Sequence, residues 1–89
     1  MRLDVWLHRV CLLKSRNQAK QGCQSGHILL DGQPVKESRE LRGDEELTLR
    51  FPRRELRVRV LAIPTGNLAK RDAAACYALL EERALRDEI

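Results

Sequence analysis

The chain has 89 residues, enough for one compact domain, and 43% of them are hydrophobic while 34% are charged. This balance excludes a disordered chain, and no apolar run approaches the roughly 20 residues that a membrane-spanning helix needs. The formal net charge is +4, which favours a negatively charged partner.

The first expected element is an amphipathic helix over residues 3–13. Leu3, Trp6, Leu7, Val10 and Cys11 recur at helical spacing and form one apolar stripe. The N-terminus has neither the long apolar segment nor the cleavage site of a signal peptide. We therefore expect no membrane association and a cytoplasmic location.

A second helix is expected to begin at Arg16 and to run to about Ser25. Ser15, with Gln18 three residues later, forms a capping box. In this arrangement the hydroxyl accepts a hydrogen bond from the Gln18 N–H, and the Gln18 amide reaches back to the Ser15 N–H. Gly26 then suits the left-handed position that ends a helix.

One face of this second helix is polar. Arg16, Lys20 and Gln24 follow one another at four-residue steps and share that face. Gly22 lies in the helix interior, where glycine costs about 1 kcal/mol relative to alanine. Close packing of the helix backbone is one reason for a glycine at this position despite that cost.

The middle of the chain predicts three or four short strands. Asp31-Gly32 is a favoured two-residue hairpin turn, and Gly43-Asp44 supplies another turn. Hydrophobic residues then alternate with polar ones, which points one set inward and the other outward. The inward set is Leu47, Leu49, Phe51, Leu56, Val58 and Val60, and Arg57 and Arg59 point outward.

An alanine-rich segment from Leu68 or Ala69 onward predicts a terminal helix. The expected fold is therefore α+β: two N-terminal helices packed on a small, mostly antiparallel sheet, plus a C-terminal helix.

Catalytic and metal-binding patterns are missing from the sequence. His8 and His27 are the only histidines, and neither has the spacing of a metal ligand or of a nucleophile–base pair. Cys11, Cys23 and Cys76 form no close pair, so they are better explained as small buried hydrophobes than as zinc ligands or disulfides. We expect no enzyme activity, no cofactor and no metal.

Positive charge is concentrated in two stretches. Residues 1–20 hold five basic and one acidic residue, a sum of +4, and residues 50–59 hold the same numbers. Lys14 and Arg16 flank the start of the second helix, where free backbone N–H groups favour phosphate, and Lys20 extends that face. This arrangement indicates a phosphate-binding face.

The few aromatic residues narrow the choice of polyanion. Trp6, Phe51 and Tyr77 are the only ones, and all three fall on expected buried faces. Single strands that are bound by base stacking therefore fit poorly. The phosphates of a folded RNA or a duplex fit better.

Four segments carry a resemblance to a known family: "RLDVWL", "KSRNQA", "GHILLDG" and "RGDEELTL". Together they resemble the RNA-binding domain of ribosomal small-subunit protein S-four, known as the S4 domain or alpha-L motif. The later segment "RVRVLAIPTGNLAKRDAAACYALLEE" is similar to the strand and terminal helix of small bacterial heat-shock proteins built on this domain. By this resemblance residues 1–63 form the S4-like domain, and residues 64–89 form a loop and helix packed on it.

The resemblance implies a function, because those heat-shock proteins bind free large ribosomal subunits that still carry a nascent chain on transfer RNA. It implies non-catalytic binding of structured ribosomal RNA on the large subunit, in rescue or recycling of stalled nascent-chain complexes. The partners are then ribosomal RNA or the large subunit, transfer RNA stays open as a further partner, and the protein is expected to be a monomer.

The resemblance also implies which residues contact RNA. They are Arg2, Lys14, Ser15, Arg16, Lys20 and Gln24, with His27 and Lys36 as weaker candidates. A second basic cluster either extends this site or is a solvated strand face; it comprises Arg53, Arg54, Arg57 and Arg59. Asp31 replaces the family's usual asparagine, and its carboxylate would repel a nearby phosphate.

Two other functions stay open at this point. One is an accessory factor in ribosome assembly or RNA modification, with catalysis supplied by another protein. The other is a protein-interaction module that uses an apolar stripe of the C-terminal helix, formed by Ala73, Cys76, Tyr77, Leu80 and Ala84.

Overall fold

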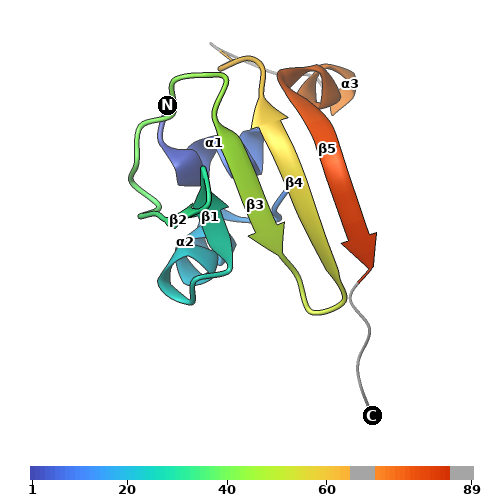
Figure 1. Ribbon diagram of the computed structural model, residues 1–89. Helices are drawn as coiled ribbons and strands as arrows, with labels where there is room; N and C mark the ends of the chain where they lie inside the picture. Colours follow the sequence, from blue (N-terminus) through green and yellow to red (C-terminus); the bar gives the residue numbers. More distant parts are fainter. Residues whose placement is uncertain (65–69, 85–89) are drawn as a thin grey trace.

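The computed structural model describes residues 1–64 and 70–84, which form a five-stranded antiparallel sheet with two helices on one face (Figure 1). The strand order is β2-β1-β3-β4-β5. The elements are α1 (Leu3–Arg9), α2 (Arg16–Gln24), β1 (Ile28–Leu30), β2 (Gln33–Pro34), β3 (Glu46–Arg50), β4 (Arg54–Val60), α3 (Lys70–Ala73), a single 3-10 turn η1 (Ala74–Cys76) and β5 (Tyr77–Ala84). The α+β architecture expected from the sequence is confirmed.

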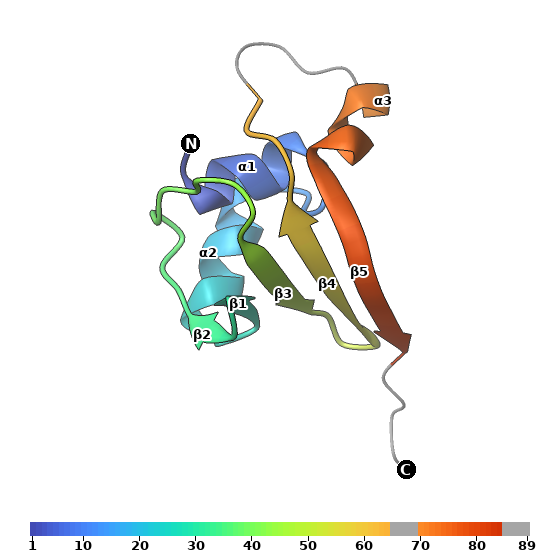
Figure 2. The same cartoon turned by 45° about the horizontal axis from the view of Figure 1, so that its top comes forward.

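The register of β3 and β4 gives the sheet one apolar and one charged face. Leu47 pairs with Val58 and Leu49 with Leu56, and all four side chains are buried toward the helices. Figure 2 shows α1 and α2 side by side on that face, with α2 nearest β1. The predicted alternation of inward and outward residues is confirmed in these two strands.

The core centres on Trp6 of α1, whose side chain is fully buried. Its indole Nε1–H donates a hydrogen bond to the Ala62 carbonyl at 3.0 Å, so the polar end of the ring is satisfied. Tyr77 packs against the indole edge-on, with ring centroids 6.4 Å apart. Tyr77 and Phe51 are only partly buried, in contrast to the expectation that all three aromatics lie on buried faces.

Both predicted turns have the backbone geometry that their residues suit. Asp31 and Gly32 have φ of 49° and 80°, as a type I′ hairpin turn requires. The Asp31 carboxylate accepts a hydrogen bond from the Glu46 N–H at 3.0 Å, so it ties this turn to the start of β3. Gly43 and Asp44 are likewise at positive φ, 112° and 58°.

The helix α1 ends at Arg9, four residues earlier than expected. Cys11 follows with φ of 63°, a left-handed conformation that stops the helix. The N–H groups of Leu12 and Leu13 then bond back to the Leu7 carbonyl, both at 3.1 Å. The chain turns at this point, so that α2 begins beside the start of α1.

Gly22 allows close packing between α2 and β1. A Cβ atom at this position would lie 2.7 Å from Cδ1 of Ile28, a separation that real side chains do not adopt. The cost of a glycine inside a helix is therefore offset by the close approach of the helix backbone to the strand.

The C-terminal helix is present but short, and the expectation of a long one is wrong for the residues described. After α3 and η1 the chain extends as β5, which pairs with β4 along its whole length. The alanine-rich segment has a high helix propensity, but β4 offers a free edge of hydrogen-bonding groups, and pairing with that edge prevails. The predicted helix start at Leu68 or Ala69 lies outside the described residues.

This strand also removes the proposed helical interaction stripe. Ala73 and Cys76 are buried in the same core as the N-terminal helices, while Leu80 is 41% exposed and lies beside a register shift in the pairing of β4 with β5. Because residues 77–84 are extended, the five residues do not share one helix face. The interaction module based on that stripe is therefore not supported.

Candidate nucleic-acid interface

The start of α2 is fixed by its predicted cap. Ser15 has extended backbone geometry, and its Oγ accepts a hydrogen bond from the Gln18 N–H at 3.1 Å. The Gln18 side chain does reach back, but its Oε1 accepts from the Lys14 N–H at 2.9 Å rather than from the Ser15 N–H. The cap thus holds the whole segment from Lys14 to Gln18 in one conformation, which places two cations at the helix start.

A hollow of about 380 Å³ lies where this helix start meets the N-terminus of α1 and the loop that follows β2. We name it the arginine hollow, and it is lined by Arg2, Asp4, Arg16, Asn17, Lys20 and Glu37. Arg2, Arg16 and Lys20, three of the predicted RNA-contacting residues, therefore line one concave surface. Arg16 and Lys20 belong to α2, whereas Arg2 directly precedes α1.

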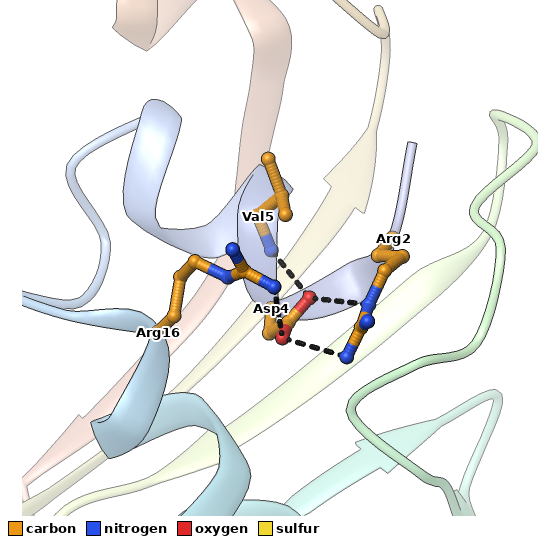
Figure 3. Close-up of polar contacts among 4 residues, drawn as sticks. All are labelled: Arg2, Asp4, Val5 and Arg16. Atoms are coloured by element: carbon orange, nitrogen blue, oxygen red, sulfur yellow. Dashed lines mark hydrogen bonds and ion pairs between the residues drawn. The ribbon is translucent and has the colours of Figure 1, made fainter.

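Asp4, which lines the arginine hollow, lies between the guanidinium groups of Arg2 and Arg16 (Figure 3). Its Oδ1 accepts hydrogen bonds from the Val5 N–H at 2.8 Å and from Arg2 Nε at 3.2 Å. Its Oδ2 accepts from Arg2 Nη2 at 3.1 Å and from Arg16 Nη2 at 3.4 Å. The Asp4 side chain is only 5% exposed, whereas those of Arg2 and Arg16 are 45% and 54% exposed.

The loop after β2 holds the N-terminus of the chain in place. The N–H of Leu3 donates to the Arg39 carbonyl at 2.8 Å, and the N–H of Asp4 donates to the Glu37 carbonyl at 3.1 Å. The terminal ammonium group of Met1 pairs with Glu40 at 2.5 Å. These bonds on either side of Arg2 fix its backbone close to the chain end.

The other predicted RNA contacts lie outside the hollow. Lys14 and Ser15 are exposed at the start of α2, and Gln24 is exposed at its end. Lys36 is exposed in the loop after β2, next to Glu37 of the hollow.

His27 lies apart from the arginine hollow. It lines a separate hollow of about 250 Å³, together with Ile28, Arg50 and Phe51. The structure therefore brings Arg2, Arg16 and Lys20 together and separates His27 from them.

The second basic cluster does not form one surface. Arg57 on the outer sheet face pairs with Glu46 at 3.2 Å and with Glu81 at 3.5 Å. Arg54 lies over the Phe51 ring at 5.1 Å and pairs with Glu82 at 3.6 Å. Because Arg54 and Arg57 are an odd number of residues apart in β4, they point to opposite faces.

The two remaining members of this cluster also lie apart. Arg53 is exposed in the turn between β3 and β4, and Arg59 is exposed on the outer face opposite Glu46. In residues 1–64 and 70–84, Arg59 has no ion pair or side-chain hydrogen bond. Two of the four arginines of this cluster, Arg54 and Arg57, are therefore paired with glutamates.

Sequence reasoning missed three residues of the arginine hollow: Asp4, Asn17 and Glu37. Asp4 is part of the Arg-Leu-Asp segment that carries the family resemblance, which was a signal for its importance. Its contact with Arg16 spans twelve residues and depends on how α1 and α2 pack. Charge counting cannot find such a contact.

Cys23 and Cys76 are small buried residues as predicted, but that prediction is wrong for Cys11, which is exposed just after the end of α1. Cys23 lies on the buried face of α2, and burial, followed by the nearby Glu37 and Asp4 carboxylates, raises the pKa of its thiol to about 11. A neutral buried thiol is a poor nucleophile. Over the part of the chain that the structure describes, no group of histidines, cysteines and carboxylates is arranged to hold a metal, and no helix is long and apolar enough to cross a membrane.

Comparison with known proteins gives one consistent family. Residues 1–47 match the family model of the S4 domain. The RQC P-site tRNA stabilizing factor of Bacillus subtilis (strain 168) is 34% identical over 85 residues, which cover 96% of this chain and 98% of that protein. The factor of the same name from Streptococcus pneumoniae is 30% identical over the full length of both.

A solved structure agrees with these relatives. The trimeric structure of Vibrio cholerae Heat Shock Protein 15 matches with a TM-score of 0.81 and 25% sequence identity, over 89% of this chain and 80% of that one. The chain therefore belongs to the S4-domain family, in the group that contains the RQC P-site tRNA stabilizing factors.

Proposed function

We propose that this protein binds structured ribosomal RNA on the large ribosomal subunit and contacts a transfer RNA there, as a non-catalytic cytoplasmic factor that acts on stalled nascent-chain complexes. The names of the relatives support this proposal, since they describe stabilisation of a P-site transfer RNA. The same RNA-binding face could serve in ribosome assembly, and the experiment below separates the two roles.

The observation that carries the proposal is the convergence of Arg2, Arg16 and Lys20 in the arginine hollow. Arginine presents several N–H donors in a planar fork that matches phosphate, and lysine adds a mobile point charge. A rigid set of such donors reads the spacing of backbone phosphates rather than the bases, as recognition of a folded RNA requires.

Four further residues would extend the contact beyond the hollow. Lys14 and Ser15 at the start of α2 would bind phosphate or ribose, and Gln24 would do so one turn beyond Lys20. Lys36 would reach RNA from the loop after β2. With about four phosphate contacts in total, the logarithm of the binding constant should fall with the logarithm of salt concentration with a slope of about −3 to −4.

The test is co-sedimentation of the tagged protein with ribosomal particles on a sucrose gradient, at low and at elevated salt. We expect it to follow free large subunits and to be released by salt and by the double substitution Arg16→Glu with Lys20→Glu. Migration with early assembly particles would favour the assembly role. A double variant that sediments like the unaltered protein would refute the assigned face.

The oligomeric state is part of the proposal. We propose that the protein acts as a monomer, although the solved structure of the Vibrio cholerae relative is trimeric. Sedimentation equilibrium over a wide concentration range measures this directly, and a stable trimer at submicromolar concentration would contradict it.

A further inference from the structure

We infer that Asp4 is a positioning residue for RNA binding: its buried carboxylate holds the guanidinium groups of Arg2 and Arg16 in a shared, pre-formed arrangement. This inference rests on the proposed function and deepens it. It assigns an essential role to a carboxylate inside a surface that binds phosphate. A count of charges would instead suggest that this carboxylate weakens phosphate binding.

The first argument is geometric. Nη2 of Arg2 and Nη2 of Arg16 both donate to the same Oδ2 of Asp4, at 3.1 and 3.4 Å. The two nitrogens can therefore lie no farther apart than the sum of these distances, 6.5 Å. Arg2 directly precedes α1 and Arg16 is the first residue of α2, so one carboxylate fixes the relation between two segments of the site.

The second argument concerns the donors that remain. A guanidinium group carries five N–H donors. Arg2 gives two of them to Asp4, which leaves three, and Arg16 gives one, which leaves four. Both side chains are about half exposed, while Asp4 is almost completely covered. The carboxylate thus contacts the arginines from the buried side and leaves most of their N–H donors accessible to a phosphate.

The third argument is electrostatic. The arginine hollow contains three cations (Arg2, Arg16 and Lys20) and two carboxylates (Asp4 and Glu37), so its net charge is only +1. Charge alone would give weak attraction. The remaining affinity must come from side chains that are already ordered before RNA binds. A long flexible side chain loses rotamer freedom when it binds, and a side chain that is already fixed does not.

The substitution Asp4→Asn separates order from charge. Asparagine keeps the size of the side chain and an acceptor for the Val5 N–H, but it cannot pair with two guanidinium groups. If only charge mattered, loss of a carboxylate beside the RNA would strengthen binding. Positioning predicts the opposite sign, a loss of about fivefold to tenfold in affinity for purified bacterial large ribosomal subunits.

Glu37→Gln is the matched control, since it removes the other carboxylate of the same hollow. The Glu37 side chain makes no ion pair or hydrogen bond with the described residues, and its backbone carbonyl is unaffected. Because Glu37 positions no arginine, its replacement leaves only the effect of charge, and we expect a higher affinity than that of the unaltered protein. A loss in Glu37→Gln as large as that in Asp4→Asn would overturn the inference.

A double-mutant cycle distinguishes positioning from a general loss of stability. When Arg2 and Arg16 are both replaced by alanine, Asp4 has nothing left to position, so Asp4→Asn should no longer weaken the residual binding. A similar weakening in both backgrounds would overturn the inference. Should Asp4→Asn fail to fold by circular dichroism, Asp4→Ser keeps an acceptor near the Val5 N–H and is held to the same expected loss.

The outcomes also separate this inference from the proposed function. If Arg16→Glu with Lys20→Glu leaves the affinity unchanged, the proposed function fails. If that double variant loses binding while folded Asp4→Asn binds as tightly as the unaltered protein or more tightly, only the positioning role fails.

Discussion

Two stretches of this chain carry the same net charge and use it differently. Residues 1–20 and residues 50–59 each sum to +4. In the first stretch, Arg2 and Arg16 converge on one buried carboxylate and keep most of their donors exposed. In the second, Arg57 is matched by two glutamates on neighbouring strands. The two regions thus differ in where the carboxylates lie. A buried carboxylate behind the arginines leaves them available to a polyanion, whereas glutamates beside an arginine on the surface do not.

The largest expected difference between the two regions is in RNA binding. Arg2→Ala removes a side chain of the arginine hollow and should lower the affinity for large subunits about tenfold to a hundredfold, since charge-assisted hydrogen bonds are lost. Arg57→Ala should change the affinity less than about twofold, because Arg57 is already paired. Filter binding measures both affinities. Equal losses in the two variants would show that the two regions do not differ in RNA binding.

A second prediction concerns the helix that carries the hollow. Gly22→Ala places a Cβ 2.7 Å from Ile28 Cδ1, so it should lower the free energy of unfolding by about 1–3 kcal/mol despite the better helix propensity of alanine. Urea unfolding measures this. The exposed Gln21→Ala in the same helix is the control and should stay within about 0.5 kcal/mol. A more stable Gly22→Ala variant would show that α2 can move away from β1.

The outer sheet face should respond weakly to the loss of an ion pair. Arg57 and its partner Glu46 are 46% and 33% exposed, so solvent screens their interaction. Arg57→Ala should therefore reduce the free energy of unfolding by less than about 1 kcal/mol. A loss of several kcal/mol in thermal unfolding would mean that the pairs of this face act as a strong network.

The smallest expected effect is on a thiol beneath the hollow. Burial, Glu37 and Asp4 raise the pKa of Cys23 from 9.0 to about 11. Asp4→Asn removes the last of these influences, so the pKa should fall somewhat and thiolate-dependent alkylation of Cys23 should begin at lower pH. Mass spectrometry of each cysteine across an alkaline pH series measures this, with exposed Cys11 as the fast-reacting reference. An unchanged or higher pKa would contradict the role of Asp4.

The same thiol gives stability a predictable pH dependence. Its folded pKa lies above its ordinary value, so the unfolded chain ionises first as pH rises. The contribution of Cys23 to stability is complete below about pH 9 and is lost as pH rises toward about 11. Cys23→Ala should therefore reduce the steepness of alkaline unfolding, and an unchanged profile would contradict this account.

The sequence predicted well those features that depend on a few neighbouring residues. The Ser15 cap and the Asp31-Gly32 turn follow from local backbone chemistry, and the alternation in β3 and β4 follows from the two-residue period of a strand. Gly22 could be flagged as unusual in a helix, although only the packing of β1 explained it.

Features that depend on distant partners were not predictable in this way. The residues of β5 have a strong helix propensity, and their extended conformation depends on the open edge of β4. The bridge from Asp4 to Arg16 depends on the packing of α1 against α2. The same limit applies to Arg57, whose neutralisation by Glu46 and Glu81 involves three strands.

The most direct test of the central claim compares two charge reversals of equal size. Arg16→Glu with Lys20→Glu changes the arginine hollow, while Arg59→Glu with Arg71→Glu changes two exposed arginines outside it. Both lower the net charge by four, so only the place of the charge differs. We predict that affinity for purified large ribosomal subunits is nearly abolished in the first variant and largely retained in the second. Equal loss in both would show that overall charge, and not the arginine hollow, binds the RNA.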